Sequence, residues 1–258
     1  MNSKRVIVVI PIYREFQKTE EISFLQGITV LKDYTFNLLH PTSFSVQPIL
    51  DRYGQSVCLT ETALPDEHFK GVQSYNDLLL TEDFYKLYSE YEYMLIYQLD
   101  AYVFEDRLAE WLDKGYDYVG APWIPTEFVL KTIFFMPYQK IRRLFPVDLY
   151  NIPHCFKYFA VGNGGFSLRR IETMRRIMAD DAGIIRKCGC NEDVYISQIA
   201  TRTHQIRIPG WREALGFSFE KSLKHSFRLN GNKLPFGCHY WSVPKRYDSF
   251  WYKFIPCS

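Results

Sequence analysis

Four segments of the sequence carry residues whose types and spacing could support chemistry on a bound ligand. In the first, the apolar run Tyr93–Leu99 ends at Asp100, which predicts a carboxylate at the carboxyl end of a buried strand. Carboxylate oxygens bind Mg²⁺ and Mn²⁺, and a cation held there would neutralise a diphosphate. The alternative role for Asp100 is to cap the turn that follows the strand.

The second segment is the glycine-rich run Gly162-Asn163-Gly164-Gly165-Phe166. Glycine permits positive φ angles and lets backbone amides approach a ligand closely. Ser167 is expected to cap a helix over Leu168–Met178, and the amino terminus of that helix would favour an anion or a sugar hydroxyl. A plain tight turn is the alternative for this loop.

The third segment, Asn191-Glu192-Asp193, places two adjacent acids at the start of an expected helix. The helix dipole alone favours acids there, but an acid beside a ligand cleft can also act as a general base on a hydroxyl. In the fourth segment, His239 stands between small and aromatic residues late in the chain. A lone histidine usually packs without further function, whereas a histidine that meets Asp100 in space would be a metal ligand.

The apolar patterning around these segments indicates an α/β fold with a mostly parallel sheet. Short apolar runs predict strands and stretches of helical period predict helices, in this order: strand Val6–Ile10, helix Thr19–Leu31, strand Phe36–Leu39, helix Asp66–Glu90, strand Tyr93–Leu99, helix Glu105–Lys114 and strand Tyr116–Val119. Four prolines among mixed aromatic and basic residues predict a loop-rich insertion around residues 124–158.

The composition is that of an ordinary globular chain with an unusual share of aromatic side chains. The 258 residues are 47% hydrophobic and 23% charged, which suits one domain with a sizeable core, and the 17% that are aromatic suit a site for flat or sugar-like ligands. Acids predominate over residues 1–150 and bases over residues 151–258, which points to an anionic ligand or surface. Short apolar runs argue against a secretory signal or a membrane span, and six cysteines without a paired C-x-x-C unit fit a reducing cytoplasm.

Taken together and in this order, the segments resemble a family of bacterial glycosyltransferase-like proteins of unknown function that have the GT-A fold of nucleotide-diphospho-sugar transferases. The resemblance is carried by Tyr97–Phe104, Gly115–Trp123, Val161–Arg169, Asn191–Tyr195 and Phe236–His239. It implies a single Rossmann-like domain over residues 1–258, with helices flanking a mostly parallel central sheet. Residues 1–123 would form the nucleotide-sugar-binding half and residues 159–258 the acceptor and catalytic half.

The resemblance also implies roles for individual residues. Asp100-Ala101-Tyr102 stands in the place of the D-x-D motif that binds metal and donor diphosphate, but the second Asp is missing. Asp100 would therefore hold Mn²⁺ or Mg²⁺ directly with His239, bind it through water, or contact the donor ribose or sugar instead. Asp193 would be the base that deprotonates the acceptor hydroxyl, with Glu192 as its neighbour or substitute. The implied donor-binding residues are Pro11, Tyr13 (stacking on the base), Glu15, Asp100, Ala101, Tyr102, Gly164, Gly165 and Trp123.

The implied reaction is the transfer of a hexose from a nucleotide-diphospho-sugar, with a UDP-sugar favoured, to a hydroxyl of a glycan or lipid-linked acceptor. Inversion at the anomeric carbon follows if Asp193 is the single catalytic carboxylate, and His239, Lys233 or Lys245 would stabilise the departing charge. The setting would be cell-surface polysaccharide synthesis in the cytoplasm, at the inner face of the membrane, with the basic and aromatic segment Phe128–Phe145 touching lipid or a lipid-linked acceptor.

Two other functions compete with this interpretation. The incomplete D-x-D motif fits a catalytically inactive protein that binds carbohydrate or nucleotide-sugar, which donor hydrolysis would distinguish. A nucleotidyltransferase is disfavoured because no glycine-rich, lysine-containing loop follows the first strand. Nucleic-acid binding is not expected, because no recognition module is evident and the arginines of the cluster Arg169, Arg170, Arg175 and Arg176 are expected on a solvated helix face.

Overall fold

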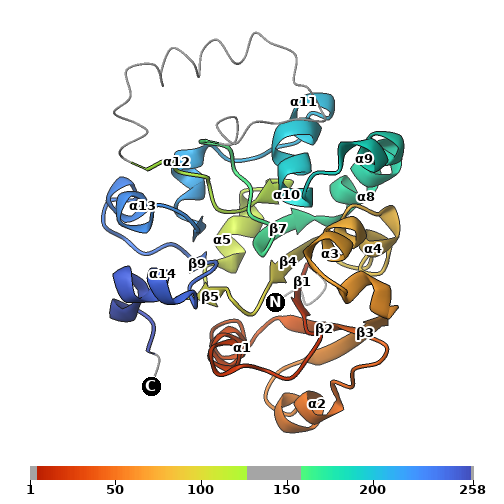
Figure 1. Cartoon of the computed structure of the whole chain (residues 1–258), viewed down its shortest axis with the longest axis horizontal. Helices are drawn as coiled ribbons and strands as arrows, with labels where there is room; N and C mark the ends of the chain where they lie inside the picture. The colour runs from red at the N-terminus through yellow and green to blue at the C-terminus, as the bar shows by residue number, and fades with distance from the viewer. Residues whose placement is uncertain (1–4, 127–157, 257–258) are drawn as a thin grey trace.

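The computed structural model describes residues 5–126 and 158–256, and the fold within them is built on two sheets (Figure 1). The main sheet has six strands in the order β3-β2-β1-β4-β7-β6. Their bounds are β1 Val6–Pro11, β2 Thr35–Pro41, β3 Leu59–Leu64, β4 Tyr93–Tyr97, β6 Tyr118–Val119 and β7 Phe166–Arg170. Strands β3, β2, β1 and β4 are parallel, and β7 runs antiparallel to both β4 and β6. The predicted α/β class with a mostly parallel sheet is confirmed.

A small second sheet joins distant parts of the chain. Its strands are β5 (Tyr102–Val103), β9 (Gly237–Cys238) and β8 (Ser218–Phe219), in the order β5-β9-β8. β5 pairs antiparallel with β9, so that Tyr102 lies opposite Cys238. This pairing brings the end of β4 beside the segment that follows β9.

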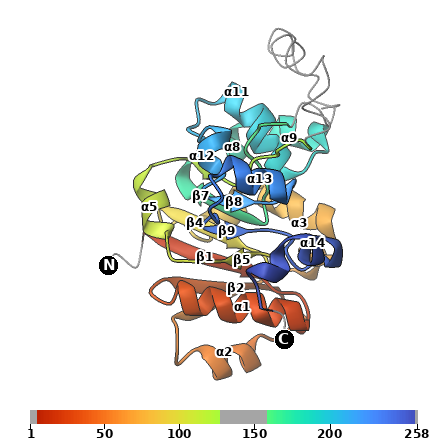
Figure 2. The same cartoon turned by 90° about the vertical axis from the view of Figure 1, so that its left-hand side faces the viewer.

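Helices cover both faces of the main sheet, as Figure 2 shows for α1 on one side and α8 on the other. Alternate residues of β1 enter two cores: Val8 packs with residues of α1 and α5, whereas Val9 packs with residues of α3, α4 and α8. Burial on both faces explains why β1 reads as an unbroken apolar run. The helices are α1 Lys18–Val30, α2 Gln47–Tyr53, α3 Val72–Leu79, α4 Glu82–Lys86, α5 Leu108–Asp113, α8 Ile171–Asp180, α9 Ala182–Cys188, α10 Glu192–Val194, α11 Thr201–Thr203, α12 Trp211–Ala214, α13 Leu223–Leu229 and α14 Pro244–Ser249, with 3-10 turns at Asp66–Phe69 and Trp251–Lys253 and a π-helical turn at Tyr195–Ala200. None of the described helices is long and apolar enough to cross a membrane.

One predicted helix begins in the wrong place, because residues 166–170 form strand β7 and α8 starts only at Ile171. Phe166 and Leu168 enter one core, while Ser167 and Arg169 are also fully buried, so the segment alternates with the period of a strand. The hydroxyl of Ser167 donates to the carbonyl of Gly164 rather than capping a helix. The helix amino terminus predicted beside the glycine-rich loop is therefore absent there.

The helix predicted over residues 66–90 is divided into a 3-10 turn, α3 and α4. Thr81 starts α4 by accepting a hydrogen bond from the amide of Phe84 at 3.3 Å, which explains the break. Strand β3 was not predicted from the sequence. The loop-rich insertion predicted around residues 124–158 falls almost wholly on residues 127–157, outside the described part of the chain.

Candidate active site

A cavity of about 590 Å³ lies at the carboxyl ends of β1 and β4, where ligands bind in open α/β sheets. The loops after these strands contribute Pro11, Tyr13 and Asp100 to its wall. The other lining residues come from α1, from α3 and the segment that leads into it, from the segments after β4, β6, β8 and β9, from the glycine-rich loop and from the turn at α10; they include Glu20, Lys70, Tyr75, Asn76, Gln98, Trp123, Asn163, Gly164, Gly165, Asn191, Glu192, Asp193, Glu220, Lys221, His239 and Tyr240. The cavity thus gathers all four segments singled out in the sequence.

Asp100 and His239 form an ion pair in this cavity. Asp100 Oδ1 lies 3.0 Å from His239 Nε2, and Gln98 Oε1 lies 3.3 Å from the same nitrogen. Burial opposes both charges, yet the pairing raises the pKa of His239 and lowers that of Asp100. Each side chain therefore favours the charged form of the other.

The same two side chains supply ligand atoms of the kind that a divalent cation takes. His239 is 4% exposed and its Nδ1 has no hydrogen-bond partner, while Asp100 offers a carboxylate. Within the described residues, no group of three or more His, Cys, Asp and Glu side chains is arranged around one point. Mg²⁺ commonly keeps several waters and takes only one or two protein ligands beside substrate phosphates, so this pair fits a cation that is completed by a diphosphate.

Asp193 lies in the turn that starts α10, half-buried in the cavity wall. Its Oδ2 accepts the amide of Asn163 at 3.1 Å, and its Oδ1 accepts the amide of Val194 at 2.7 Å. Burial and the negative charges of Glu192 and Glu220 raise the pKa of Asp193 to about 7. A carboxyl group with a pKa near neutrality is suited to accept a proton from a hydroxyl.

Glu192 has a different environment from its neighbour Asp193. Its Oε1 lies 2.6 Å from Nη2 of Arg169, and the side chains of the two residues are 5% and 0% exposed. The amide of Glu192 also donates to Asn76 Oδ1 at 3.1 Å. The carboxylate of Glu192 is thus held by a buried arginine, whereas that of Asp193 receives backbone amides.

The glycine-rich loop uses its glycines for close packing, not for positive φ. The residue with positive φ in this loop is Asn163, at 68°. A Cβ on Gly162 would lie 2.2 Å from the Trp123 ring, one on Gly164 would lie 1.7 Å from Glu192 Oε1, and one on Gly165 would lie 2.1 Å from His239 Nε2. The expectation that the glycines supply positive φ is wrong, and their hydrogen atoms instead make room for three side chains of the cavity wall.

Of the remaining residues predicted for the donor site, some line the cavity and others do not. Tyr13 lines the cavity and is 54% exposed, and Trp123 lines it while donating from Nε1 to Glu220 Oε2 at 3.1 Å. Glu15, Ala101 and Tyr102 do not line the cavity, and the latter two are buried at the start of β5.

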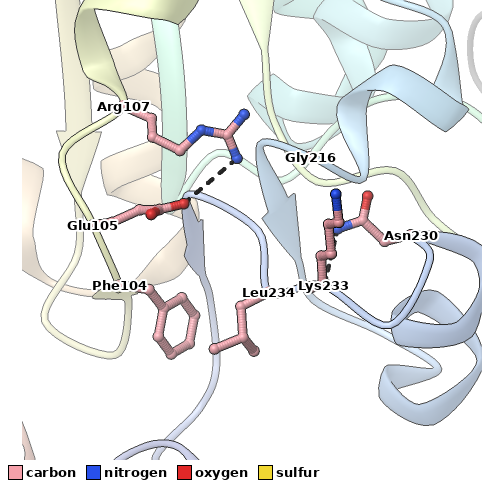
Figure 3. A pocket seen from close by; sticks show the side chains of 7 residues that line it. All are labelled: Phe104, Glu105, Arg107, Gly216, Asn230, Lys233 and Leu234. Atoms are coloured by element: carbon pink, nitrogen blue, oxygen red, sulfur yellow. Dashed lines mark hydrogen bonds and ion pairs between the residues drawn. The ribbon is translucent and has the colours of Figure 1, made fainter.

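The two lysines predicted to stabilise the departing charge do not line the main cavity. Lys233 lies in a separate depression of about 570 Å³ beside Phe104 and Arg107 (Figure 3), and Lys245 does not line the main cavity. Arg246, which the sequence did not single out, lies over the Tyr240 ring at 5.1 Å and donates to the carbonyl of Glu220 at 2.8 Å. Its charge also helps to lower the pKa of Asp100.

Comparisons with known proteins identify a family by its sequence and similar solved structures by their fold. The family described as Protein of unknown function (DUF5672) matches residues 59–239. No curated protein matches the sequence of the chain. Similar solved structures include the galactosyltransferase LgtC in complex with donor and acceptor sugar analogs, with a TM-score of 0.56 and 12% identity over 92% of this chain and 87% of that chain.

Two further structures share the fold. Mouse xyloside xylosyltransferase 1 has a TM-score of 0.54 and 10% identity, covering 90% of this chain and 96% of that chain. The glycosyltransferase GlyE of Streptococcus pneumoniae TIGR4 has a TM-score of 0.53 and 15% identity, covering 99% of this chain but 62% of that chain. The chain therefore has the fold of GT-A glycosyltransferases.

Proposed function

We propose that this chain, which belongs to the DUF5672 family, transfers a hexose from a nucleotide-diphospho-sugar to a hydroxyl group of an acceptor. The observation that carries the proposal is that one cavity holds both groups that could bind a diphosphate and a group that could act as a base. Asp100 and His239 offer a carboxylate and an imidazole for the diphosphate end of a donor, and Asp193 offers a carboxyl group with a pKa of about 7. The similarity to solved glycosyltransferases supports the fold that places them.

In the proposed reaction, Asp193 takes the proton of the acceptor hydroxyl as that oxygen attacks the anomeric carbon. The bond between the sugar and the nucleoside diphosphate breaks, and the leaving group keeps the electron pair. The amides of Asn163 and Val194 orient the Asp193 carboxylate for this transfer. With Asp193 as the single base, attack from the face opposite the leaving group inverts the anomeric centre.

The negative charge of the leaving group also needs stabilisation. Asp100 and His239 would hold a divalent cation, Mn²⁺ or Mg²⁺, and such a cation would neutralise diphosphate oxygens when bound. The Arg246 guanidinium adds a fixed positive charge beside this pair. Tyr13, exposed at the cavity wall, offers a ring on which the nucleotide base can stack.

We propose a UDP-sugar as donor and a glycan or lipid-linked hydroxyl as acceptor, in the synthesis of bacterial cell-surface polysaccharide at the cytoplasmic face of the membrane. The proposal of membrane contact rests on the sequence of Phe128–Phe145 alone, because the whole segment lies outside the described residues. The second candidate, a binding protein without transferase activity, is favoured by one observation. Tyr102, in the place of the second Asp of the D-x-D motif, is 6% exposed and does not line the cavity.

A thermal-shift screen against UDP, GDP, CMP and dTDP sugars, each with and without Mn²⁺ or Mg²⁺, tests the proposal first, because a ligand that binds the folded state raises its apparent stability. A donor found in this way is then incubated with the protein to measure the release of nucleoside diphosphate, and NMR of the product sugar reports inversion or retention. Donor binding with neither transfer nor hydrolysis would favour the binding protein.

A further inference from the structure

Arg169 on β7 is buried more completely than a charged side chain usually is. It is 0% exposed, and its guanidinium donates to Ser167 Oγ (3.0 Å), Tyr85 Oη (3.0 Å), the carbonyl of Gly164 (3.2 Å) and Glu192 Oε1 (2.6 Å). Burying a charge is unfavourable unless it is paired and hydrogen-bonded, and an apolar pair of similar volume is often as stable. A contribution to stability alone therefore does not explain why the chain buries Arg169 and Glu192. The segments that the pair holds together offer a better explanation.

Two hydrogen-bond partners of Arg169 belong to the two segments that surround Asp193. Gly164 is in the glycine-rich loop, and Glu192 immediately precedes Asp193 in the turn at α10. The amide of Asn163, also in the loop, donates to Asp193 Oδ2 at 3.1 Å. Through one nitrogen, Nη2, Arg169 thus binds both the segment that carries Asp193 and the segment that hydrogen-bonds to it.

The contact between these two segments leaves little free space. A Cβ on Gly164 would lie 1.7 Å from Glu192 Oε1 and 2.7 Å from the carboxyl carbon of that residue. The planar guanidinium makes several hydrogen bonds in fixed directions, which the ammonium of a lysine cannot reproduce. Arg169, which does not line the cavity, is thus in contact with both segments that hold the Asp193 carboxylate.

We propose that Arg169 is a positioning residue for Asp193, and that Glu192 is the counter-ion of Arg169 instead of a second base. The inference rests on the proposed function insofar as Asp193 is the base. It adds that the turn at α10 and the glycine-rich loop act as one unit, joined by a buried ion pair. It also assigns different roles to two adjacent acids that the sequence does not distinguish.

Several titratable groups face Asp193 and must be considered when its ionisation is measured. Glu192 precedes it, Cys190 lies two residues further back, and Tyr118, Glu220 and Tyr240 approach from β6, from the segment after β8 and from the segment after β9. The acids Glu192 and Glu220 raise the pKa of Asp193. Loss of the Glu192 charge should therefore move the ionisation of Asp193 to lower pH.

The test compares Arg169→Lys, Glu192→Gln and the double variant R169Q/E192Q with the matched control variants Arg175→Lys and Glu172→Gln. The control pair lies on α8, with Nη2 of Arg175 2.8 Å from Oε1 of Glu172; their side chains are 34% and 72% exposed, and Arg175 also pairs with Glu82 of α4 at 3.1 Å. The double variant removes both charges of the pair and leaves neither of them unpaired, so it stays informative if a single variant fails to fold. Measurements are the unfolding midpoint, kcat and donor KM from pH 5 to 9, and the unfolding midpoint of each variant combined with Asp193→Asn.

For Arg169→Lys we expect kcat to fall by about tenfold to a hundredfold with donor KM within about threefold, because small misplacements of a catalytic group are costly. Glu192→Gln should shift the acidic limb of the kcat/KM profile to lower pH and keep measurable activity. The control variants should change neither quantity. The proposal is overturned if Arg169→Lys lowers kcat only in proportion to the folded fraction, or if Glu192→Gln abolishes transfer while Asp193→Asn does not.

A readout without catalysis separates this inference from the proposed function. For the wild type, Glu192→Gln and the double variant, the stability is measured with and without the additional change Asp193→Asn. The pH dependence of the difference in stability reports the pKa of Asp193, even if the protein turns over no donor. A lowered pKa in Glu192→Gln and in the double variant, without any transfer activity, would uphold the link between the pair and Asp193 and reject the transferase. An unchanged pKa in both variants would reject the link.

Discussion

The carboxylate of Asp100 and the imidazole of His239 meet at 3.0 Å although they lie in opposite halves of the chain. Asp100 follows β4 and precedes β5, while His239 follows β9, and the pairing of Tyr102 with Cys238 in the small sheet fixes their separation. The backbone adds to this register, since the amide of Trp241 donates to the carbonyl of Asp100 at 3.2 Å. The small sheet thus completes a site that the large sheet begins.

From this relationship we predict that Asp100→Ala and His239→Ala each weaken donor binding in the presence of Mn²⁺ by about tenfold or more, since removal of one ligand leaves the cation poorly held. Chelation with EDTA should weaken binding by the wild-type protein similarly. Calorimetric titration with the donor nucleotide measures both effects. His68→Ala, in the 3-10 turn before α3, serves as the control. Equal affinity with and without Mn²⁺ in the wild-type protein would show that the pair does not act through a metal.

We predict that Asp193→Asn lowers kcat by about 10²- to 10⁴-fold while donor affinity stays within about threefold, because a base acts in the transition state and contributes little to ground-state binding. The transfer rate and a donor titration provide the two numbers. Asp51→Asn on α2, distant from the cavity, should leave both unchanged. Full activity in Asp193→Asn would remove this residue from the mechanism.

The pKa of Asp193 predicts opposite pH trends for activity and for stability. Its folded value of about 7 lies above the value of about 3.9 for an unfolded aspartate, so folding favours the protonated carboxyl. The resulting contribution to stability is complete below about pH 4 and is lost as the pH rises through about 7. A base must be ionised, so kcat/KM should instead rise through about pH 7.

Thermal unfolding and kcat/KM measured from pH 5 to 9 check these trends. The free energy of unfolding of Asp193→Asn minus that of the wild-type protein should be larger at pH 9 than at pH 5, because the asparagine cannot ionise. A stability difference that is independent of pH would contradict the raised pKa. Glu220→Gln offers a second check, since removal of a charge that raises the pKa of Asp193 should move the rise in kcat/KM to lower pH.

Local patterns in the sequence were sufficient to predict the central strands. β1, β2 and β4 lie between two layers of helices. β1 and β4 therefore read as continuous apolar runs, while β2 is equally buried but is interrupted by Asn37 and His40. β3 was missed because it is an edge strand with a partly exposed, polar sequence, Leu59–Leu64. The sequence of β7 predicts the start of a helix because Ser167 is of a residue type that caps helices, but its hydroxyl binds the carbonyl of Gly164 instead.

The burial of Arg169 could not be predicted from its neighbours in the sequence. Its partners Tyr85 and Glu192 come from distant segments, and only the fold brings their polar atoms to the guanidinium. The segments containing Asp100, Asp193 and His239 were recognisable from residue type and order. Their distances, and the separate placement of Lys233, depend on strand pairings that a single sequence does not specify.

The close approach of Gly165 to His239 gives a final prediction. A Cβ on Gly165 would lie 2.1 Å from His239 Nε2 and 2.6 Å from Gln98 Oε1, so Gly165→Ala must displace the imidazole from Asp100. We expect a loss of about 1–3 kcal/mol of stability, typical of overpacking, together with weaker Mn²⁺-dependent donor binding. Urea unfolding and calorimetric titration measure the two quantities.

Gly183→Ala on α9 is the matched control, since no atom lies within 4 Å of the added Cβ. Alanine is favoured over glycine inside a helix by about 1 kcal/mol, so this variant should be at least as stable as the wild-type protein and bind donor equally well. A Gly165→Ala variant that is destabilised yet binds donor and Mn²⁺ like the wild-type protein would mean that the position of His239 against Asp100 matters for the fold and not for the ligand.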